Sequence, residues 1–380
     1  MDATTARRRT RPMPVDQASK AGAARPGPVP RAAPPLPAEV ATAAPATMRA
    51  VAHDRYGPAS SLQLRDVAVP APGPDEVLVE VHAAGVDRGV AHLVTGRPWL
   101  VRLAGYGLRR PRQPVAGTDV AGRVVAVGSA TTRFRLGAMV FGLASGAYAG
   151  YATAREATLA PLPPGVGVEA AAATPTSGLA ALQALRDVGR VAPGQRVLVV
   201  GASGGVGAFA VQLGRHLGAR VTGVASAAKL DLVRSLGAEA VVDYTAEDAL
   251  DGSVRYDLVI DVGGRSSLRR LRRALVPWGT LVIAGGEHPN PVTGGAGRQL
   301  RALALSPFVP QRLTAFVSRQ RGADIAELGR LLATGAIVAP VDRTYRLDAA
   351  PEALADLEAG RVRGKSVIRI APRPHPAPGA

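Results

Sequence analysis

An apolar strand, a glycine-rich turn, a helix and a second strand follow one another in residues 196–229, RVLVVGASGGVGAFAVQLGRHLGARVTGVASAAK. Gly205 lets a backbone approach a pyrophosphate with no Cβ between them, and Gly207 lets the helix pack closely on the strand. The start of the helix would point its amide donors and positive dipole end at the phosphates. The segment therefore predicts a dinucleotide-binding βαβ unit, with a tight turn that binds no ligand as the alternative. The residues predicted to surround the phosphates are Gly201, Ser203, Gly204, Gly205, Val206 and Gly207.

The length of 380 residues is enough for two domains with sizeable cores. No apolar run reaches the roughly 20 residues that a membrane helix needs, so we expect a soluble, cytoplasmic protein without a membrane partner. The chain has no cysteine, which excludes disulfides, thiolate metal sites and a cysteine nucleophile. Its six histidines form no close-spaced ligand pair, and we therefore expect no metal site.

The formal net charge of +17 raises the question of nucleic-acid binding, because clustered basic side chains bind phosphate backbones. Lysine occurs only as Lys20, Lys229 and Lys365, so nearly all basic residues are arginines, and they are spread along a chain rich in Ala and Gly. This distribution indicates a coding bias. Aromatic residues, which would stack on bases, make up only 4% of the chain, and the composition therefore argues against a nucleic-acid partner.

Composition and hydrophobic pattern divide the chain into five parts. Residues 1–47 and 371–380 are rich in Pro and Ala without apolar periodicity, so we expect a disordered extension and a disordered tail. An arginine-rich transit peptide is the alternative for the first part, although acidic residues and prolines disfavour it. Residues 48–172 show short strands punctuated by Gly and Pro, whereas residues 173–312 alternate strands with helices, which predicts a doubly wound parallel sheet. Residues 313–370 resemble a return to the first domain.

Several further segments are similar to those of the medium-chain dehydrogenase/reductase superfamily, in its zinc-free, quinone-oxidoreductase-like branch. The resemblance implies an α/β fold, with a GroES-like catalytic domain in residues 48–172 and 313–370 and a Rossmann NADP-binding domain in residues 173–312. It also implies a homodimer formed through the edges of the Rossmann sheets, with residues 308–317 as the candidate strand. The matching segments are GPDEVLVEVHAAGVD at 73–87, PVAGTDVAGRVVAVG at 114–128, AAATPTSGLAALQAL at 171–185, SLGAEAVVDY at 235–244 and GKSVIRI at 364–370.

The chain departs from the zinc enzymes of this superfamily at their ligand positions. Asp87 stands where those enzymes place a catalytic cysteine, and Thr118 and Asp119 stand where they place a His-Glu pair. Their structural cysteine cluster is also missing. The resemblance therefore implies hydride transfer that depends on positioning and electrostatics rather than on a metal ion.

The end of the second Rossmann strand predicts which dinucleotide binds. A carboxylate there would bond the ribose 2′-hydroxyl of NAD and repel the 2′-phosphate of NADP, but the chain has Ser226 and then Lys229. Tyr244 matches a tyrosine that lines the 2′-phosphate pocket of NADPH-dependent relatives. We therefore predict NADPH, with a solvated cation at a helix start as the alternative for Lys229. The resemblance implies further cofactor contacts at Thr176, Ser177, Val262, Gly263, Gly264, Gly285, Gly286 and Lys365, the glycines being simple turns in the alternative interpretation.

The chemistry requires a proton source, because a hydride delivered to an enone or quinone leaves negative charge on an oxygen. His92 is the first candidate, since an imidazole titrates near neutrality and relatives often have a tyrosine at this position in the pocket; an exposed bystander is the alternative. Asp87 could orient the cofactor or His92, or cap the following turn. Tyr148 is the third catalytic candidate.

Aromatic residues are the candidates for the substrate pocket, because ligand sites favour them and this chain has few. Trp99, Tyr106 and Tyr148 could form its walls, with core packing as the competing use. Residues 97–114, RPWLVRLAGYGLRRPRQP, are predicted to form a mobile basic flap. Its arginines could attract an anionic or conjugated acyl substrate, or belong to a solvated loop.

The sequence thus predicts a zinc-independent, NADPH-dependent oxidoreductase that reduces a small-molecule quinone or α,β-unsaturated carbonyl compound. One alternative is a zinc-free alcohol dehydrogenase or carbonyl reductase with the same cofactor. Another, from a different class, is a non-catalytic NADPH sensor or nucleic-acid-binding protein that keeps the fold without turnover.

Overall fold

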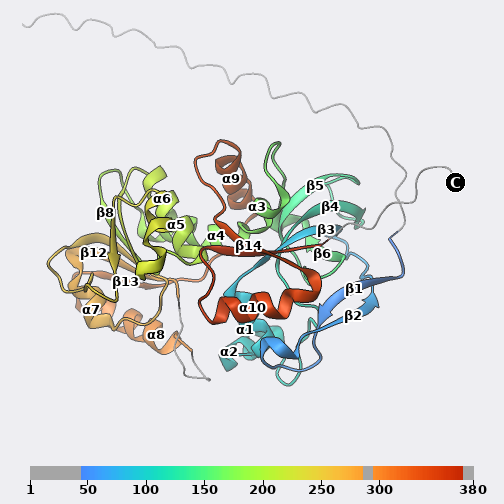
Figure 1. Ribbon diagram of the computed structural model, residues 1–380, viewed down its shortest axis with the longest axis horizontal. Coiled ribbons are helices and arrows are strands. Elements are labelled where there is room, and N and C mark those ends of the chain that lie inside the picture. Colours follow the sequence, from blue (N-terminus) through green and yellow to red (C-terminus); the bar gives the residue numbers. More distant parts are fainter. Residues whose placement is uncertain (1–43, 286–293, 371–380) are drawn as a thin grey trace, which may run out of the picture. The chain divides into compact units, whose positions relative to one another are not determined.

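The computed structural model describes residues 44–285 and 294–370. Most of the predicted N-terminal extension and the whole predicted tail lie outside these residues. Within them, the strands form a two-stranded, a seven-stranded and a six-stranded sheet, and Figure 1 shows the two larger sheets with α4 between them. None of the described helices is long and apolar enough to cross a membrane.

The seven-stranded sheet is built mostly from the first half of the chain. Its strand order is β14-β15-β3-β4-β5-β7, with β6 paired to β3, and all pairs are antiparallel except β14 with β15. The last two strands of the chain therefore return to the first sheet, as predicted. The bounds are β3 Glu76–Val86, β4 Asp119–Val127, β5 Met139–Leu143, β6 Tyr151–Arg155, β7 Leu159–Pro161, β14 Val341–Arg346 and β15 Lys365–Arg369, and the separate two-stranded sheet pairs β1 Thr47–Ala52 with β2 Gln63–Ala68.

The six-stranded sheet is entirely parallel and has the order β10-β9-β8-β11-β12-β13. Successive strands are added on one side of β8 up to β10 and on its other side from β11 onward, so the space between β8 and β11 is the switch point at which doubly wound sheets bind their ligands. The predicted doubly wound sheet is confirmed. Its last strand, β13, continues past the expected boundary at residue 312, because it pairs with β12 of this sheet and not with the first sheet. The bounds are β8 Arg196–Val200, β9 Arg220–Ala225, β10 Ala240–Asp243, β11 Tyr256–Asp261, β12 Leu275–Ile283 and β13 Arg312–Ala315.

Helices cover both sheets and connect their strands. The longer described ones are α1 Arg88–Thr95, α4 Pro175–Gln183, α5 Gly205–His216, α8 Ala296–Leu305, α9 Gly322–Ala333 and α10 Ala350–Glu358. The shorter ones are η1 Ala59–Ser61, α2 Trp99–Val101, η2 Arg102–Tyr106, η3 Glu156–Thr158, α3 Val168–Ala172, η4 Ala184–Gly189, η5 Ala227–Lys229, α6 Leu230–Ser235, α7 Leu268–Arg273, η6 Ser306–Phe308 and η7 Leu347–Ala349.

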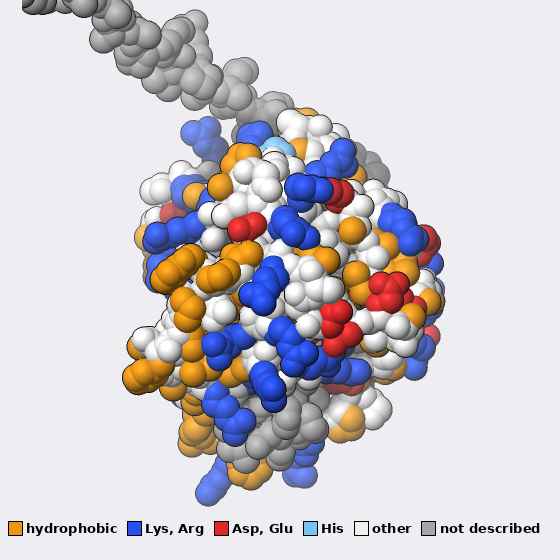
Figure 2. All heavy atoms as spheres, turned by 90° about the vertical axis from the view of Figure 1, so that its left-hand side faces the viewer, with side chains coloured by type: hydrophobic (Ala, Val, Ile, Leu, Met, Phe, Trp, Pro, Cys, Tyr) orange, Lys and Arg blue, Asp and Glu red, His pale blue; other side chains and the backbone are white. Residues whose placement is uncertain are grey.

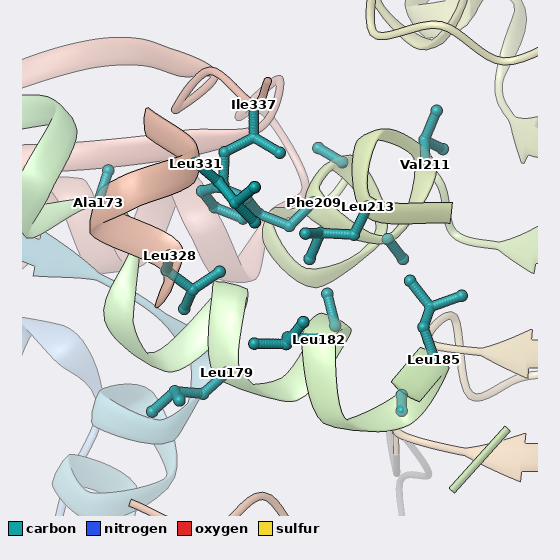
Figure 3. Packing of buried hydrophobic residues seen from close by; sticks show 14 of the residues in the cluster. Ala173, Leu179, Leu182, Leu185, Phe209, Val211, Leu213, Leu328, Leu331 and Ile337 are labelled. Atoms are coloured by element: carbon teal, nitrogen blue, oxygen red, sulfur yellow. The ribbon is translucent and has the colours of Figure 1, made fainter. Parts of the chain in front are cut away.

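A shared hydrophobic core joins the two larger sheets. It contains Phe141 of β5 and Val199 of β8 in a single cluster of buried side chains. Figure 3 shows leucines of α4 and η4 packed between α5 and α9 at its centre. Because such cores are packed as densely as organic crystals, this cluster holds the residues at the ends of both sheets in fixed positions. The side chains that Figure 3 labels there include Leu179, Leu182, Leu185, Phe209, Leu213, Leu328 and Leu331.

Candidate functional site

The glycine-rich turn follows β8 and leads into α5, as the sequence predicts. Gly201 has a φ of 87°, a conformation that L side chains rarely adopt. A Cβ on Gly207 would lie 2.1 Å from the carbonyl oxygen of Gly201, so the close packing of helix on strand requires glycine here. Gly204 is the N-cap of α5, which begins at Gly205. The amides of Gly201, Ala202 and Gly204 donate to backbone carbonyl oxygens, so the start of the helix, rather than the turn before it, is what offers amide donors at the switch point of the sheet.

Gly205 faces two side chains from other elements, Ser177 of α4 and Lys365 of β15. A Cβ on Gly205 would lie 2.7 Å from the Ser177 Oγ and 2.9 Å from the Lys365 Cδ. The amide of Gly364 also donates to the carbonyl oxygen of Ser203 at 2.9 Å. The structure thus brings together four of the predicted cofactor residues in one narrow cradle.

Lys365 carries a buried cation. Its side chain is 2% exposed, and its Nζ has no hydrogen-bond partner among the described residues. The nearest opposite charge is the Asp119 carboxylate, with 3.9 Å between Nζ and Oδ2. An unsatisfied buried ammonium is costly, and a phosphate oxygen in the cradle would satisfy it. The residues present therefore fit the diphosphate of a dinucleotide.

Asp119, at the start of β4, is fully buried beside this cradle. Its carboxylate accepts hydrogen bonds from the Thr176 amide at 3.2 Å and the Thr176 hydroxyl at 2.5 Å. Burial, followed by the nearby negative charge of Asp87, raises the pKa of Asp119 to about 7, against the opposing effects of Lys365 and Thr176. The sequence interpretation noted this residue only as a departure from the zinc enzymes. Nothing in the sequence indicated that Thr176, which was predicted as a cofactor contact, would form hydrogen bonds with the Asp119 carboxylate.

The residues at the end of β9 lie where the adenosine ribose would be placed. Ser226 follows the strand directly, and the amide of the exposed Tyr244 donates to the carbonyl oxygen of Ala225 at 3.2 Å. Lys229 is half-buried, and its Nζ donates to the carbonyl oxygens of Gly360 at 2.7 Å and Val362 at 2.8 Å. Burial lowers its pKa against the opposing charge of Asp342, and the nearby Arg363 and Arg88 lower it further. The site is therefore rich in cations.

Glycines end β11 and β12 at the same edge of the sheet. The amides of Val262 and Gly263 both donate to the carbonyl oxygen of Val200 at 3.0 Å, so this turn lies against the glycine-rich one. Gly264 has a φ of 73°, and a Cβ on Gly285 would lie 2.0 Å from the Val262 carbonyl oxygen. The backbone conformation and close packing explain these glycines as turns, and the same turns could also contact a cofactor, so both interpretations stay open. Gly286 lies outside the described residues.

A buried ion pair that the sequence did not reveal supports this edge. Arg298 of α8 bonds the fully buried Asp261 at the end of β11, and donates to the carbonyl oxygens of Ser266 at 2.9 Å and Gly285 at 3.0 Å. Burial raises the pKa of Asp261, while the Arg298 charge lowers it. The arginine thus ties together the turns that follow β11 and β12.

The three predicted catalytic residues have different surroundings. Asp87 caps α1, its Oδ1 accepting from the Val90 amide at 3.1 Å, and the capping interpretation is confirmed. Tyr148 is fully buried and its hydroxyl donates to the Gly85 carbonyl oxygen at 3.2 Å, so it packs in the core instead of forming a pocket wall. Burial raises its pKa well above the usual range. His92 lies half-buried on α1.

A cavity of about 260 Å³ lies beside α1 and the start of β4. Tyr106 lines it as predicted, whereas Trp99 is exposed and does not. The histidine in its wall is His53, not His92. His53 is buried, its Nδ1 is 3.1 Å from the Arg55 carbonyl oxygen, and burial lowers its pKa. Other lining residues are Val90, Leu93, Val94, Pro111, Gln113, Gly117, Thr118, Leu143 and Ser145.

Three other features bear on what the protein can bind. A larger cavity of about 600 Å³ lies elsewhere, between β1, β6 and η7, and none of the predicted site residues lines it. Over the described ranges, no group of three or more His, Cys, Asp or Glu side chains could hold a metal ion. On the face that Figure 2 shows, basic side chains are spread widely, with no single stripe of the kind that follows a nucleic-acid backbone.

Comparisons with known proteins agree with this geometry. Residues 73–164 match the alcohol dehydrogenase GroES-like domain, and residues 236–368 match the zinc-binding dehydrogenase family. A chloroplastic quinone oxidoreductase of Triphysaria versicolor is 30% identical, with 84% of this chain and 98% of the relative covered. A trans-enoyl reductase of Aspergillus terreus is 32% identical, with 87% of this chain and 98% of the relative covered.

Solved structures give the same result. The quinone oxidoreductase of Coxiella burnetii has a TM-score of 0.75 and 27% identity, covering 86% of this chain and all of that one. A mycobacterial protein in complex with NADPH has a TM-score of 0.71 and 28% identity, with 85% and 99% covered. The predicted combination of a GroES-like and a Rossmann domain is confirmed. The chain belongs to the medium-chain dehydrogenase/reductase superfamily, among its quinone-oxidoreductase-like members, and is an oxidoreductase.

Proposed function

We propose that this oxidoreductase uses NADPH to reduce quinones or α,β-unsaturated carbonyl compounds, without a metal ion. The main observation in favour of a bound nicotinamide dinucleotide concerns Lys365. Its buried Nζ lacks a hydrogen-bond partner in the described structure, and its side chain packs beside Gly205 and Ser177. Support comes from the solved relative that binds NADPH. When bound, the dinucleotide supplies the hydride.

The preference for NADPH over NADH rests on charge at the end of β9. Ser226 stands where NAD-specific sites place a carboxylate. Lys229 and Arg363 add positive charge there, although Lys229 currently bonds two backbone carbonyl oxygens and Arg363 pairs with Asp231 at 2.5 Å. A 2′-phosphate would compete for these cations. Measuring the affinities for NADPH and NADH tests the preference, and equal or tighter binding of NADH would contradict it.

Polar groups of the 260 Å³ cavity would hold the substrate oxygen. The Thr118 hydroxyl donates to Asp87 Oδ2 at 3.4 Å, a distance that indicates a weak bond. A substrate oxygen in the cavity would compete for this donor as negative charge develops on it. His53 is neutral near pH 7 because burial lowers its pKa, so it adds no fixed positive charge to the cavity wall. His92 does not line the cavity, but it lies on α1, which does, and it stays the proposed proton donor.

The metal-free mechanism rests on the residues at the ligand positions of the zinc enzymes. Asp87 has its Oδ1 engaged as the cap of α1, and Thr118 and Asp119 replace the His-Glu pair. A hydroxyl is a poor ligand for zinc, which prefers thiolate, imidazole and carboxylate. Turnover that a chelator leaves unchanged is the expected result, and loss of turnover that added zinc restores would contradict it.

Assays of turnover and of binding separate the proposed reductase from the alternative functions. Some solved relatives are alcohol dehydrogenases, one of them NAD-dependent, so a carbonyl reductase is the second candidate and would reduce aldehydes in preference to enones. A sensor would bind NADPH without turning over either class. Salt-sensitive binding to a polynucleotide would favour the nucleic-acid alternative.

We also propose a homodimer formed through β13. This strand is the edge of the six-stranded sheet, with β12 on one side only, and an unpaired edge is a template for pairing with another chain. The flanking Phe308 and Val317 are strongly exposed. Sedimentation is expected to show a dimer at micromolar concentration, and a monomer would contradict the proposal.

A further inference from the structure

The segment of residues 97–112 presents apolar side chains to solvent. It comprises α2 and η2 and the turn after them. Leu103 is 70% exposed, Leu108 65% and Trp99 52%, and Leu100 and Tyr106 are also among the exposed large apolar residues. Five such side chains thus lie within ten residues of the chain, a concentration of exposed apolar surface that monomeric soluble proteins seldom leave uncovered without a function.

The same segment is strongly basic. Between residues 88 and 118 the sequence contains no aspartate or glutamate, so the positive charge of the segment has no acidic neighbour along the chain. Of the arginines of the segment, one precedes its exposed apolar residues, one lies among them and three follow them. These arginines are Arg97, Arg102, Arg109, Arg110 and Arg112.

Contacts from Tyr56 hold the base of the segment in place. Its hydroxyl lies 2.9 Å from the carbonyl oxygen of Tyr106 and 2.6 Å from that of Gly107, and the Arg102 guanidinium stacks 4.3 Å from its ring centre. The Arg102 Nε also donates to the Gly96 carbonyl oxygen at 2.9 Å. These contacts fix the backbone of the segment, while its leucine and tryptophan side chains stay exposed to solvent.

We propose that residues 97–112 dock on the surface of an anionic lipid bilayer. Tryptophan and leucine tips would enter the boundary between headgroups and acyl chains, and the neighbouring arginines would meet the anionic headgroups. This is contact with the membrane surface and requires no spanning helix, so it goes beyond the sequence argument, which concerned only the length of apolar runs.

The pattern of the segment favours lipid over other anionic partners. A nucleic acid would pair with the arginines and could stack on Trp99, but it offers no apolar environment for Leu103 and Leu108. A bilayer satisfies both kinds of side chain at once. Tyr106 and Pro111 also line the 260 Å³ cavity, so docking would place that cavity beside the lipid; this last point rests on the proposed function, whereas the docking itself does not.

The test is sedimentation of the full chain with vesicles, of phosphatidylcholine alone and of phosphatidylcholine with phosphatidylserine. We expect binding to the anionic vesicles, weakened by salt. Replacing both leucines (Leu103→Ser with Leu108→Ser), or both arginines (Arg109→Gln with Arg110→Gln), is expected to lower the partition coefficient about tenfold or more. Circular dichroism and thermal unfolding establish that each variant is folded.

Matched controls separate the segment from the general positive charge of the chain. Leu300→Ser with Val338→Ser removes exposed apolar residues elsewhere, and Arg269→Gln with Arg273→Gln removes two exposed arginines of α7. Both control pairs are expected to bind vesicles as the parent does. Equal losses in test and control variants would overturn the proposal.

Tryptophan fluorescence provides a second readout. The chain has two tryptophans, so Trp278→Phe leaves Trp99 as the reporter. Its emission is expected to shift to shorter wavelength on anionic vesicles and to be protected from a soluble quencher. An unshifted emission in the presence of bound vesicles would contradict docking through this segment. A shift that appears only on self-association or with a polynucleotide would assign the surface to that partner instead.

Discussion

Replacing Lys365 by methionine separates a cofactor contact from a structural role. Met keeps an apolar stem of similar length, and no hydrogen bond of the described structure is lost because the buried Nζ makes none. The 3.9 Å ion pair with Asp119 is also removed, but Asp119, whose pKa is already about 7, can take up a proton instead of keeping an unpaired buried charge. The unfolding free energy of the unliganded protein is therefore expected not to fall below pH 7, since a buried unsatisfied ammonium is itself costly. A charge-assisted hydrogen bond is worth about 1.5–3 kcal/mol, which corresponds to a loss of about 10- to 150-fold in dinucleotide affinity.

The assay is a titration of NADPH and NADH by nucleotide fluorescence, with thermal unfolding of the same samples. Because the diphosphate is common to both nucleotides, Lys365→Met is expected to weaken both by the same factor. Unchanged affinity for both would refute the phosphate contact. A joint loss of affinity and of thermal stability would assign Lys365 to the fold instead.

Three further predictions address other parts of the site. Lys229→Ala is expected to weaken NADPH by about tenfold and leave NADH unchanged, as one lost charge contact predicts; equal effects on both nucleotides in the same titration would contradict it. The pKa of Asp119 is raised by burial to about 7, so its contribution to stability is full below about pH 4 and is lost as the pH rises through 7. Relative to Asp119→Asn, the parent is therefore expected to lose about 4 kcal/mol of unfolding free energy between these limits, and parallel pH profiles from denaturant titrations would refute the raised pKa. Gly207→Ala is expected to cost about 1–3 kcal/mol by overpacking, because its Cβ would lie 2.1 Å from a carbonyl oxygen, whereas the control Gly204→Ala, whose Cβ has 3.6 Å to its nearest contact, is expected to cost much less; denaturant unfolding that shows equal costs would contradict the packing argument.

Local sequence patterns were sufficient to predict the parallel sheet and its glycine-rich turn. The apolar run of β8 is typical of a strand buried on both faces, and the requirement for glycine at Gly207 follows from backbone geometry that the neighbouring residues dictate. These features depend on residues close together in the chain, and the structure confirms them.

Contacts between distant segments could not be predicted in the same way. Asp119 and Lys365 are separated by 246 positions in the chain and meet only because β15 pairs with β3 and β3 with β4. His53 reaches the cavity because its amide donates to the Pro114 carbonyl oxygen at 2.9 Å, a pairing with no signature in the sequence. Tyr148 was predicted in the pocket because aromatic residues are rare in this chain, but it is buried in the core. Gly117 packs directly on its ring, since a Cβ on Gly117 would lie 2.4 Å from a ring carbon.

The most direct test of the account is the oxidation of NADPH by the purified full chain, followed by absorbance against quinones, enones and aldehydes, with and without a chelator. The account predicts turnover with quinones or enones that the chelator leaves unchanged, and that Lys365→Met reduces in proportion to its weaker nucleotide binding. Turnover confined to aldehydes, dependence on a metal ion, or tight NADPH binding without any turnover would contradict it.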